Sequence, residues 1–257
     1  MSVAPKKALG QHFLVDENIL GVIGRMSGLD ATDVVLEVGP GLGVLTRYLA
    51  DRVRTVHSVE LDRSLESSLR EALGGRSNVQ LVWADALQID IDALEPSPGK
   101  LVANLPYNVA TPLVVETLEH ARSLEHWCVM VQREVADRFF AAPRTKSYGA
   151  VSVLVQLSAR KTGFHGVSPR VFRPPPRVDS ALVAFDRTPG APISSVRTVV
   201  QAAFAHRRKT AANSIAIAGV APRDRVEEVL AAIGHPASAR AEELEPLEFV
   251  VLAEALR

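Results

Sequence analysis

The feature that most constrains the fold of this chain is an apolar run that leads directly into a glycine-rich turn. Residues 34–38 read Val-Val-Leu-Glu-Val, and residues 39–43 read Gly-Pro-Gly-Leu-Gly. Apolar side chains then recur at helical spacing in residues 44–49, so the segment predicts a strand, a turn and a helix. Glycines lack a Cβ, which lets the backbone approach a ligand closely, and the helix N-terminus directs N–H groups towards it. This turn is expected to bind a nucleotide-like molecule.

Acidic residues at the ends of two further strands narrow the choice of ligand. The run 55–59 ends at Glu60, whose carboxylate can accept from both hydroxyls of a ribose. The run 79–83 leads to Asp85, which is well placed to accept from an adenine amino group. The fingerprint of a dinucleotide site requires a third glycine at the position where this chain has Val44. NAD and S-adenosylmethionine sites share the first acid, whereas a nicotinamide enzyme does not require the second.

A fourth strand, at residues 101–103, leads into Asn104-Leu105-Pro106-Tyr107. The amide oxygen of Asn104 and the carbonyl of Leu105 can both accept from one exocyclic amino group, while the proline has no competing N–H and the tyrosine offers a stacking surface. Alone, such a string is also typical of a strand followed by a proline turn. Because the glycine turn, both acids and this string follow successive strands, we expect them at the carboxyl edge of one parallel sheet. Chemistry on a nucleobase is indicated.

The pattern along the chain predicts two domains. Strands and helices alternate to about Leu157, which favours a right-handed, doubly wound α/β sheet, although residues 148–167 fit either a helix or a strand. An N-terminal arm that carries Lys6 and Lys7 is expected to close over the ligand. After a Pro/Gly boundary the patterns are helical. We therefore expect one domain at 1–187 and a small all-helical domain at 193–257.

Composition excludes several classes of protein. The chain has 257 residues, 47% of them hydrophobic, which suffices for one large core and a smaller one. Its single cysteine, Cys128, rules out a disulfide framework and is more typical of a core strand than of a reactive thiol. No leader pattern opens the sequence, no apolar stretch approaches the ~20 residues that cross a bilayer, and no Cys/His group has zinc-ligand spacing. A cytoplasmic protein without a metal site is expected.

The formal net charge is zero, yet the charges are segregated. A stretch with few acids extends from residue 133 to 177, a second basic cluster follows at 206–209, and acids concentrate at 242–248. A segregated basic face can bind RNA on a neutral protein, with strong salt sensitivity. The alternative is that these are ordinary solvated residues, some of them paired with nearby acids.

On its motifs, the chain resembles the ribosomal RNA adenine dimethyltransferases, and most closely the branch that acts on the small ribosomal subunit. The glycine turn is common to many methyltransferases, and N-L-P-Y to several that methylate amino groups. The proline-rich motif at 172–181 and the motif at 207–214 are far more specific to this family. The matching segments are L-G-Q-H-F-L at 9–14, E-V-G-P-G-L-G at 37–43, E-L-D at 60–62, N-L-P-Y-N at 104–108, Q-R-E-V at 132–135, F-R-P-P-P-R-V-D-S-A at 172–181 and R-R-K-T-x-x-N-S at 207–214.

This resemblance implies a Rossmann-like class I methyltransferase sheet with an antiparallel strand at 178–185 and a small C-terminal all-helical domain. His12 is a departure, since many relatives carry Asn there; it is either a tolerated replacement or a solvent-facing loop residue. The implied catalytic residues are Asn104, Leu105, Pro106 and Tyr107. The implied contacts to S-adenosyl-L-methionine are His12, Leu14, Gly39, Gly41, Glu60, Leu61, Asp85, Ala86 and Asn104. The candidate RNA contacts are Arg133, Arg138, Arg144, Lys146, Arg173, Arg207, Arg208 and Lys209.

The implied reaction is dimethylation of the N6 amino groups of two adjacent adenosines in a loop near the 3′ end of 16S rRNA. The expected partner is that RNA within the small ribosomal subunit or its precursor, bound by a monomer with no membrane and no metal. Three alternatives stay open: a large-subunit rRNA methyltransferase of the macrolide-resistance type, a non-catalytic RNA-binding assembly factor, and a nicotinamide-dependent oxidoreductase, which Val44 disfavours.

Overall fold

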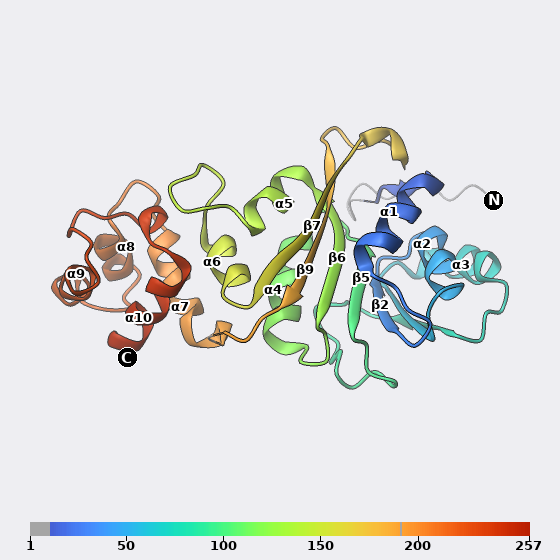
Figure 1. Cartoon of the computed structure of the whole chain (residues 1–257), viewed down its shortest axis with the longest axis horizontal. Helices are drawn as coiled ribbons and strands as arrows, with labels where there is room; N and C mark the ends of the chain where they lie inside the picture. Colours follow the sequence, from blue (N-terminus) through green and yellow to red (C-terminus); the bar gives the residue numbers. More distant parts are fainter. Residues whose placement is uncertain (1–10, 191) are drawn as a thin grey trace. The chain divides into compact units, whose positions relative to one another are not determined.

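The computed structural model describes residues 11–190 and 192–257, so Lys6 and Lys7 of the expected N-terminal arm lie outside the described residues. The described chain divides into two compact units (Figure 1). The first contains the residues up to Ala136 together with Lys161–Arg187, and the second contains Asp137–Arg160 together with the residues from Thr188 to Arg257.

The first unit is built on a seven-stranded sheet in the order β4-β3-β2-β5-β6-β9-β7. Neighbouring strands from β4 to β6 pair in parallel, and β9 pairs antiparallel with β6. This arrangement confirms the predicted doubly wound α/β class and its antiparallel strand. The strands are β2 Val34–Val38, β3 Thr55–Glu60, β4 Val79–Trp83, β5 Lys100–Asn104, β6 His126–Gln132, β7 Ala159–Val167 and β9 Ser180–Arg187.

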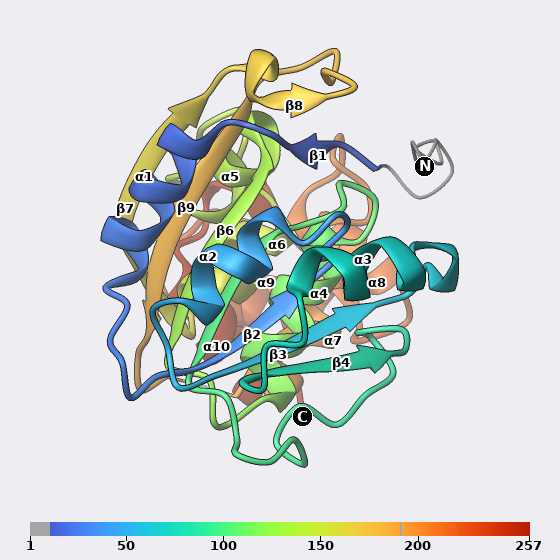
Figure 2. The ribbon, with the colours of Figure 1, turned by 90° about the vertical axis from the view of Figure 1, so that its right-hand side faces the viewer.

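Helices cover both faces of this sheet. Figure 2 shows α1, α2 and α3 in front of the strands and α4 behind them. Side chains of α1 and α2, among them Leu20 and Leu49, pack on the buried strand residues Val56, Val102 and Met130. Burial of each such side chain contributes roughly 1.5–3 kcal/mol, which fixes the layers. The helices are α1 Glu17–Ser27, α2 Val44–Ala50, α3 Glu66–Leu73 and α4 Ala110–His120.

Local signals set the ends of α1. The Asp16 carboxylate accepts from the Asn18 N–H at 2.8 Å, which satisfies one of the free N–H groups of the first turn. At the other end Gly28 adopts a left-handed conformation, with φ of 52°, and its N–H bonds to the Arg25 carbonyl. The helix α1 therefore begins and ends where capping residues stand.

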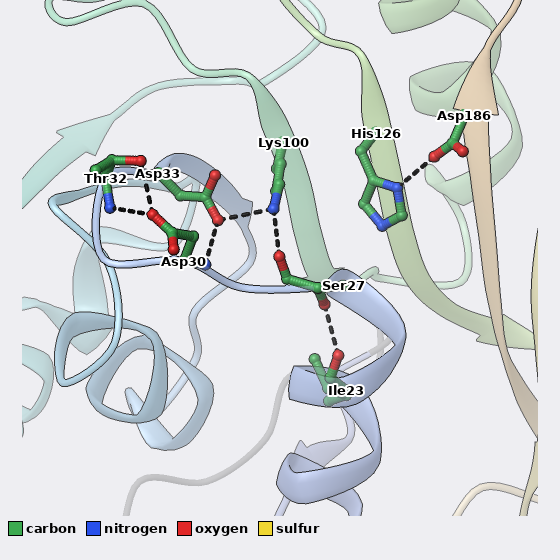
Figure 3. A network of polar contacts seen from close by, with 9 residues as sticks. Ile23, Ser27, Asp30, Thr32, Asp33, Lys100, His126 and Asp186 are labelled. Carbon is green, nitrogen blue, oxygen red and sulfur yellow. Dashed lines mark hydrogen bonds and ion pairs between the residues drawn. The ribbon is translucent and has the colours of Figure 1, made fainter.

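Polar contacts hold the amino-terminal edge of the sheet (Figure 3). Lys100, at the start of β5, donates from Nζ to the Gly28 carbonyl at 2.6 Å and to Asp33 at 2.7 Å. His126 Nδ1, at the start of β6, lies 2.6 Å from an Asp186 carboxylate oxygen. The C-cap residue of α1, the loop before β2 and three strands are thereby held together at the edge opposite the strand ends that carry the motifs.

The second unit is helical, and its extent corrects the boundary expected from the sequence. Residues 137–160, placed by that expectation in the domain 1–187, belong instead with the C-terminal helices expected at 193–257. The reason is packing: α6 lies against α7 and α10, the Tyr148 hydroxyl donates to the Leu244 carbonyl at 2.8 Å, and the Arg144 N–H donates to the Glu242 carbonyl at 2.7 Å. The helices are α6 Ala150–Gln156, α7 Ile193–Phe204, α8 Ala211–Ile217, α9 Arg223–Ala232 and α10 Pro246–Ala255, and α5 Arg133–Phe139 spans the point where the chain passes between the units. Among the described residues, no helix is long and apolar enough to span a bilayer.

Candidate active site

A cavity opens at the carboxyl edge of the parallel strands in the first unit. The space inside it, open solvent at its mouth included, is about 1060 Å³. It is lined by segments that follow β2, β3, β4 and β5, because parallel strands bring their carboxyl ends to the same edge. Every residue proposed from the sequence for cofactor or catalysis lines it: His12, Leu14, Gly39, Gly41, Glu60, Leu61, Asp85, Ala86, Asn104, Leu105, Pro106 and Tyr107.

Glycine is needed in this turn for two reasons: the backbone has positive φ values, and neighbouring rings lie too close for a Cβ. Gly39 has φ of 74°, and a Cβ added there would lie 3.2 Å from the ring of Pro106. Gly41 has φ of 57°, and a Cβ there would lie 2.9 Å from the ring of Phe13. A side chain at either position would be strained and would push apart the segments that frame the cavity.

Glu60 ends β3 with its carboxylate anchored by backbone donors. One oxygen accepts from the Asp62 N–H at 2.8 Å and the other from the Gly41 N–H at 3.3 Å. Burial raises the pKa of Glu60, and these N–H donors oppose the rise. A carboxylate can accept about four hydrogen bonds, so lone pairs remain for hydroxyl groups of a ligand.

Asp85 follows β4 and is more open than Glu60. One of its oxygens accepts from the Leu87 N–H at 3.0 Å, which fixes the carboxylate, and the side chain is otherwise exposed. Leu61 is 57% exposed although it lines the cavity, and Ala86 lines it as well. An apolar surface beside two acceptors is a suitable site for an adenosine group.

Sequence reasoning missed Glu37, which also lines the cavity. Only 1% of this residue is exposed, and one of its carboxylate oxygens accepts from the Ser58 hydroxyl at 3.0 Å. Burial raises the pKa of Glu37 to about 7, and the nearby charge of Glu60 adds to the rise. A carboxylate in an otherwise apolar strand was the signal that marked it in the sequence.

The amide of Asn104 is fixed in one orientation. Its Nδ2 donates to the His12 carbonyl at 3.1 Å, so the amide oxygen is left for another donor. The next residue, Leu105, donates its N–H to the Met130 carbonyl of β6 at 3.0 Å, which anchors the backbone that carries the second proposed acceptor. Two acceptor positions are thereby held at the end of β5.

Tyr107 is held at both its hydroxyl and its ring. The hydroxyl lies 2.6 Å from Ser180 Oγ, and the His12 imidazole lies against the ring with centroids 5.4 Å apart and planes inclined by 32°. Burial raises the pKa of Tyr107, and the Ser180 hydrogen bond opposes part of this rise. Because the net effect is a higher pKa, the phenol stays neutral at ordinary pH. His12 Nδ1 lies 2.8 Å from the Pro174 carbonyl, and since a carbonyl only accepts, this nitrogen carries the proton.

A short antiparallel pair of strands supports the contact between His12 and Pro174. β1 Phe13–Leu14 pairs with β8 Phe172–Arg173, and Figure 2 shows the two strands side by side. The pair joins the segment after residue 10 to the proline-rich motif. It thereby sets the position of His12 over the end of β5.

The proposed RNA contacts are divided between the units. Arg133 and Arg173 belong to the first unit, and the Arg133 guanidinium lies 4.8 Å from the Phe164 ring centroid. In the second unit, the Arg207 guanidinium donates to the Lys146 carbonyl at 3.3 Å, so two basic segments separated in the sequence lie together. The second unit holds Arg138, Arg144, Lys146, Arg207, Arg208 and Lys209.

The described residues contain one group of side chains with the potential to bind a metal ion. Glu116, Glu119 and His120 on α4 offer ligand atoms within 4.8 Å of one another. None of the three lines the cavity. They therefore play no part in the candidate site.

An antiparallel strand beside a parallel sheet, with a glycine turn and acid-ended strands around one cavity, defines the class: this is a Rossmann-like class I methyltransferase, of the kind that uses S-adenosylmethionine. Residues 4–250 match the ribosomal RNA adenine dimethylase family, and the chain belongs to that family.

Similar proteins agree with this assignment. The chain is 51% identical to a ribosomal RNA small subunit methyltransferase A from Rubrobacter xylanophilus, over 96% of this chain and 94% of the relative. It is 42% identical to a protein of the same name from Desulfitobacterium hafniense, over 97% of this chain and 91% of the relative.

Two solved structures share the architecture. The 23S rRNA methyltransferase ErmE aligns with a TM-score of 0.67 at 32% identity, over 95% of this chain and 99% of the other. A dimethyladenosine transferase from Plasmodium falciparum aligns with a TM-score of 0.79, over 94% of this chain and 96% of the other, and at 22% identity it shows the shared fold.

Proposed function

We propose that this protein transfers methyl groups from S-adenosylmethionine to the N6 amino groups of two adjacent adenosines near the 3′ end of 16S rRNA. The observation that carries the proposal is the fixed Asn104 amide, whose oxygen is left for a donor in the same cavity as Glu60 and Asp85. The names of the relatives from R. xylanophilus and D. hafniense support the small-subunit substrate. A role in small-subunit biogenesis follows from that substrate.

The cofactor half of the site fits an adenosine group with a charged tail. Glu60 would accept from the ribose hydroxyls and Asp85 from the adenine amino group, with Leu61 and Ala86 against the adenine ring. The close backbone at Gly39 and Gly41, with His12 and Leu14 opposite, would receive the remainder. When bound, S-adenosylmethionine supplies a sulfonium methyl group that a nitrogen lone pair can attack.

The residues proposed to bind the target adenine compensate for its amino group being a weak nucleophile. The lone pair of an adenine amino group is conjugated with the ring, so attack requires that pair to be localised on nitrogen. The Asn104 amide oxygen and the Leu105 carbonyl would each accept one N–H bond of the amino group, which favours this change. Tyr107 would hold the base by stacking, worth about 1–3 kcal/mol, while Pro106 offers no competing N–H.

No general base is needed before transfer. Alignment of donor and acceptor in line can contribute up to about 7–11 kcal/mol in favourable cases. The proton released from the methylated nitrogen can leave to solvent afterwards. For the second transfer, the monomethylated nitrogen must return with its remaining hydrogen directed at one of the two acceptors. The target base must also be unpaired or flipped, which costs least in a loop.

RNA binding is assigned to the basic residues of both units. Arg133 and Arg173 lie in the unit that holds the cavity, while Lys146 and Arg207 are neighbours in the helical unit. The other assigned contacts, Arg138, Arg144, Arg208 and Lys209, belong to the helical unit too. Contacts of this kind neutralise phosphates, so binding should weaken steeply with salt. We further propose a cytoplasmic monomer that acts on the small subunit or its precursor.

A second candidate is methylation of large-subunit rRNA. It is favoured by the 32% identity to the 23S rRNA methyltransferase ErmE over 95% of this chain. A non-catalytic assembly role is the third possibility, and the intact Asn104 and Tyr107 speak against loss of catalysis. The higher identity to the small-subunit relatives supports the first candidate more strongly than the second.

The test is to incubate the protein with S-adenosylmethionine and small subunits that lack adenine methylation, digest the RNA and measure N6,N6-dimethyladenosine by mass spectrometry. Its appearance near the 3′ end is the expected result. Modification of large subunits alone would move the protein to the second candidate. Absence of product from both subunits would refute methyl transfer.

A further inference from the structure

Ser180 occupies a position that links the sheet to the candidate site. It is the first residue of β9, and it pairs with Gln132, the last residue of β6. Because β9 is antiparallel, its first residue lies at the edge where the parallel strands end. The side chain is fully buried, and its hydroxyl is 2.6 Å from the Tyr107 hydroxyl.

We propose that Ser180 is a positioning residue, which holds the Tyr107 ring in the orientation that receives the target adenine. This role rests on the proposed function. The ring is joined to the backbone at one end, so a hydrogen bond at the far end fixes the direction in which the ring points, which is set by rotation about the Cα–Cβ bond. Without that bond the ring keeps its stacking surface and loses its fixed position.

The other contacts of Tyr107 hold its ring and its backbone, and the bond to Ser180 holds its hydroxyl. The His12 imidazole limits the ring from another side, and it is itself tied to Pro174. The backbone before the ring is fixed by the bond from Leu105 to β6. The backbone and one side of the ring are thus held by other contacts, and Ser180 holds the position of the hydroxyl end.

A positioning role differs from a purely structural one in its dependence on Tyr107. A buried serine that only stabilises the fold would act on stability and cofactor binding whatever stands at position 107. A serine that acts through the phenol has no further effect once the phenol hydroxyl is gone. Misplacement of the base relative to the methyl donor lowers kcat more than it changes cofactor affinity.

The experiment compares Ser180→Ala, Tyr107→Phe and the double variant. Turnover is measured with S-adenosylmethionine and small subunits lacking adenine methylation, and cofactor Kd by calorimetry. Each single change should lower kcat about tenfold, equivalent to about 1.4 kcal/mol, with cofactor Kd within twofold. The double variant should be no slower than the slower single variant. Ser27→Ala, which removes another buried serine hydroxyl in the same unit, should keep wild-type turnover.

Two results overturn the role: wild-type kcat in Ser180→Ala, or a fall in kcat of about a hundredfold in the double variant. If Ser180→Ala does not fold, Tyr107→Phe removes the same hydrogen bond while the buried serine stays in place, and unchanged kcat there also refutes the role. A wild-type protein that leaves small subunits unmethylated overturns the proposed function instead.

Discussion

Glu37→Gln is predicted to remove a loss of stability that the wild-type protein undergoes as the pH rises. The Glu37 carboxyl is almost completely buried in β2, and its pKa rises from 4.5 to about 7 because burial disfavours the charged form. Between these two pH values the folded protein keeps a proton that the unfolded chain releases. Stability therefore falls as the pH rises through that window, and the full cost is present above about pH 7.

The magnitude follows from the difference between the two pKa values. At about 1.4 kcal/mol for each pKa unit, a rise from 4.5 to about 7 corresponds to about 3 kcal/mol. Glutamine has nearly the same shape, stays neutral, and its amide oxygen can accept from Ser58 as the carboxyl does. The variant should therefore gain about 3 kcal/mol relative to wild type between pH 4.5 and pH 8.

Urea unfolding at both pH values measures this gain. Trp83 and Trp127 are the two tryptophans of the chain, and both lie in the unit that holds Glu37, so their fluorescence reports on that unit. The difference in unfolding free energy between variant and wild type, compared at pH 8 and pH 4.5, cancels the packing cost of glutamine. A difference that does not change with pH would refute the buried, proton-holding state of Glu37.

Three further changes test other parts of the structure. Asn104→Ala should abolish methyl transfer while RNA binding stays intact in a filter assay; unchanged turnover would contradict the acceptor role. Changing Arg207 and Arg208 to Ala should reduce the slope of log affinity against log salt by about 0.7–0.9 for each phosphate that is no longer neutralised, with Arg223→Ala, whose guanidinium is ion-paired within its own helix, as the control. An equal slope in all three proteins would mean that the RNA binds elsewhere. Arg187→Met should lower the unfolding free energy by about 3 kcal/mol in urea, because the guanidinium donates to three carbonyls at and just beyond the end of α4 at 2.7–2.9 Å; a decrease below about 1 kcal/mol would show that these carbonyls find other donors.

The proximity of the proposed cofactor residues was predictable from the sequence. Each acidic residue lies at the carboxyl end of its own strand: Glu60 ends β3, and Asp85 follows β4. Once the strands are known to be parallel, their carboxyl ends must share an edge, so proximity follows without any knowledge of packing. The glycine turn was equally readable, because positive φ values at Gly39 and Gly41 favour the one residue type that stands there.

The rest depends on contacts that no local pattern encodes. The boundary at residue 187 missed the packing of residues 137–160 on the C-terminal helices, since the bond from Tyr148 to Leu244 joins segments 96 residues apart. The ambiguity at 148–167 arose because the segment contains both a helix, α6, and a strand, β7, in immediate succession. Glu37 was passed over because the sequence marks it only as a carboxylate in an apolar strand, while the burial that raises its pKa comes from the folded layers.

The two halves of the site differ in the range of the contacts that hold them. Glu60 and Asp85 each accept from an N–H group two residues further along the chain, and Glu60 also accepts from the Gly41 N–H, 19 residues before it. Asn104 and Tyr107 are fixed across 92 and 73 residues, by His12 and Ser180. Local contacts are kept wherever the strand and turn are kept, whereas distant contacts change with the segments that supply them. A fold of this kind can therefore retain the proposed cofactor side and acquire a different methyl acceptor through changes in the distant segments.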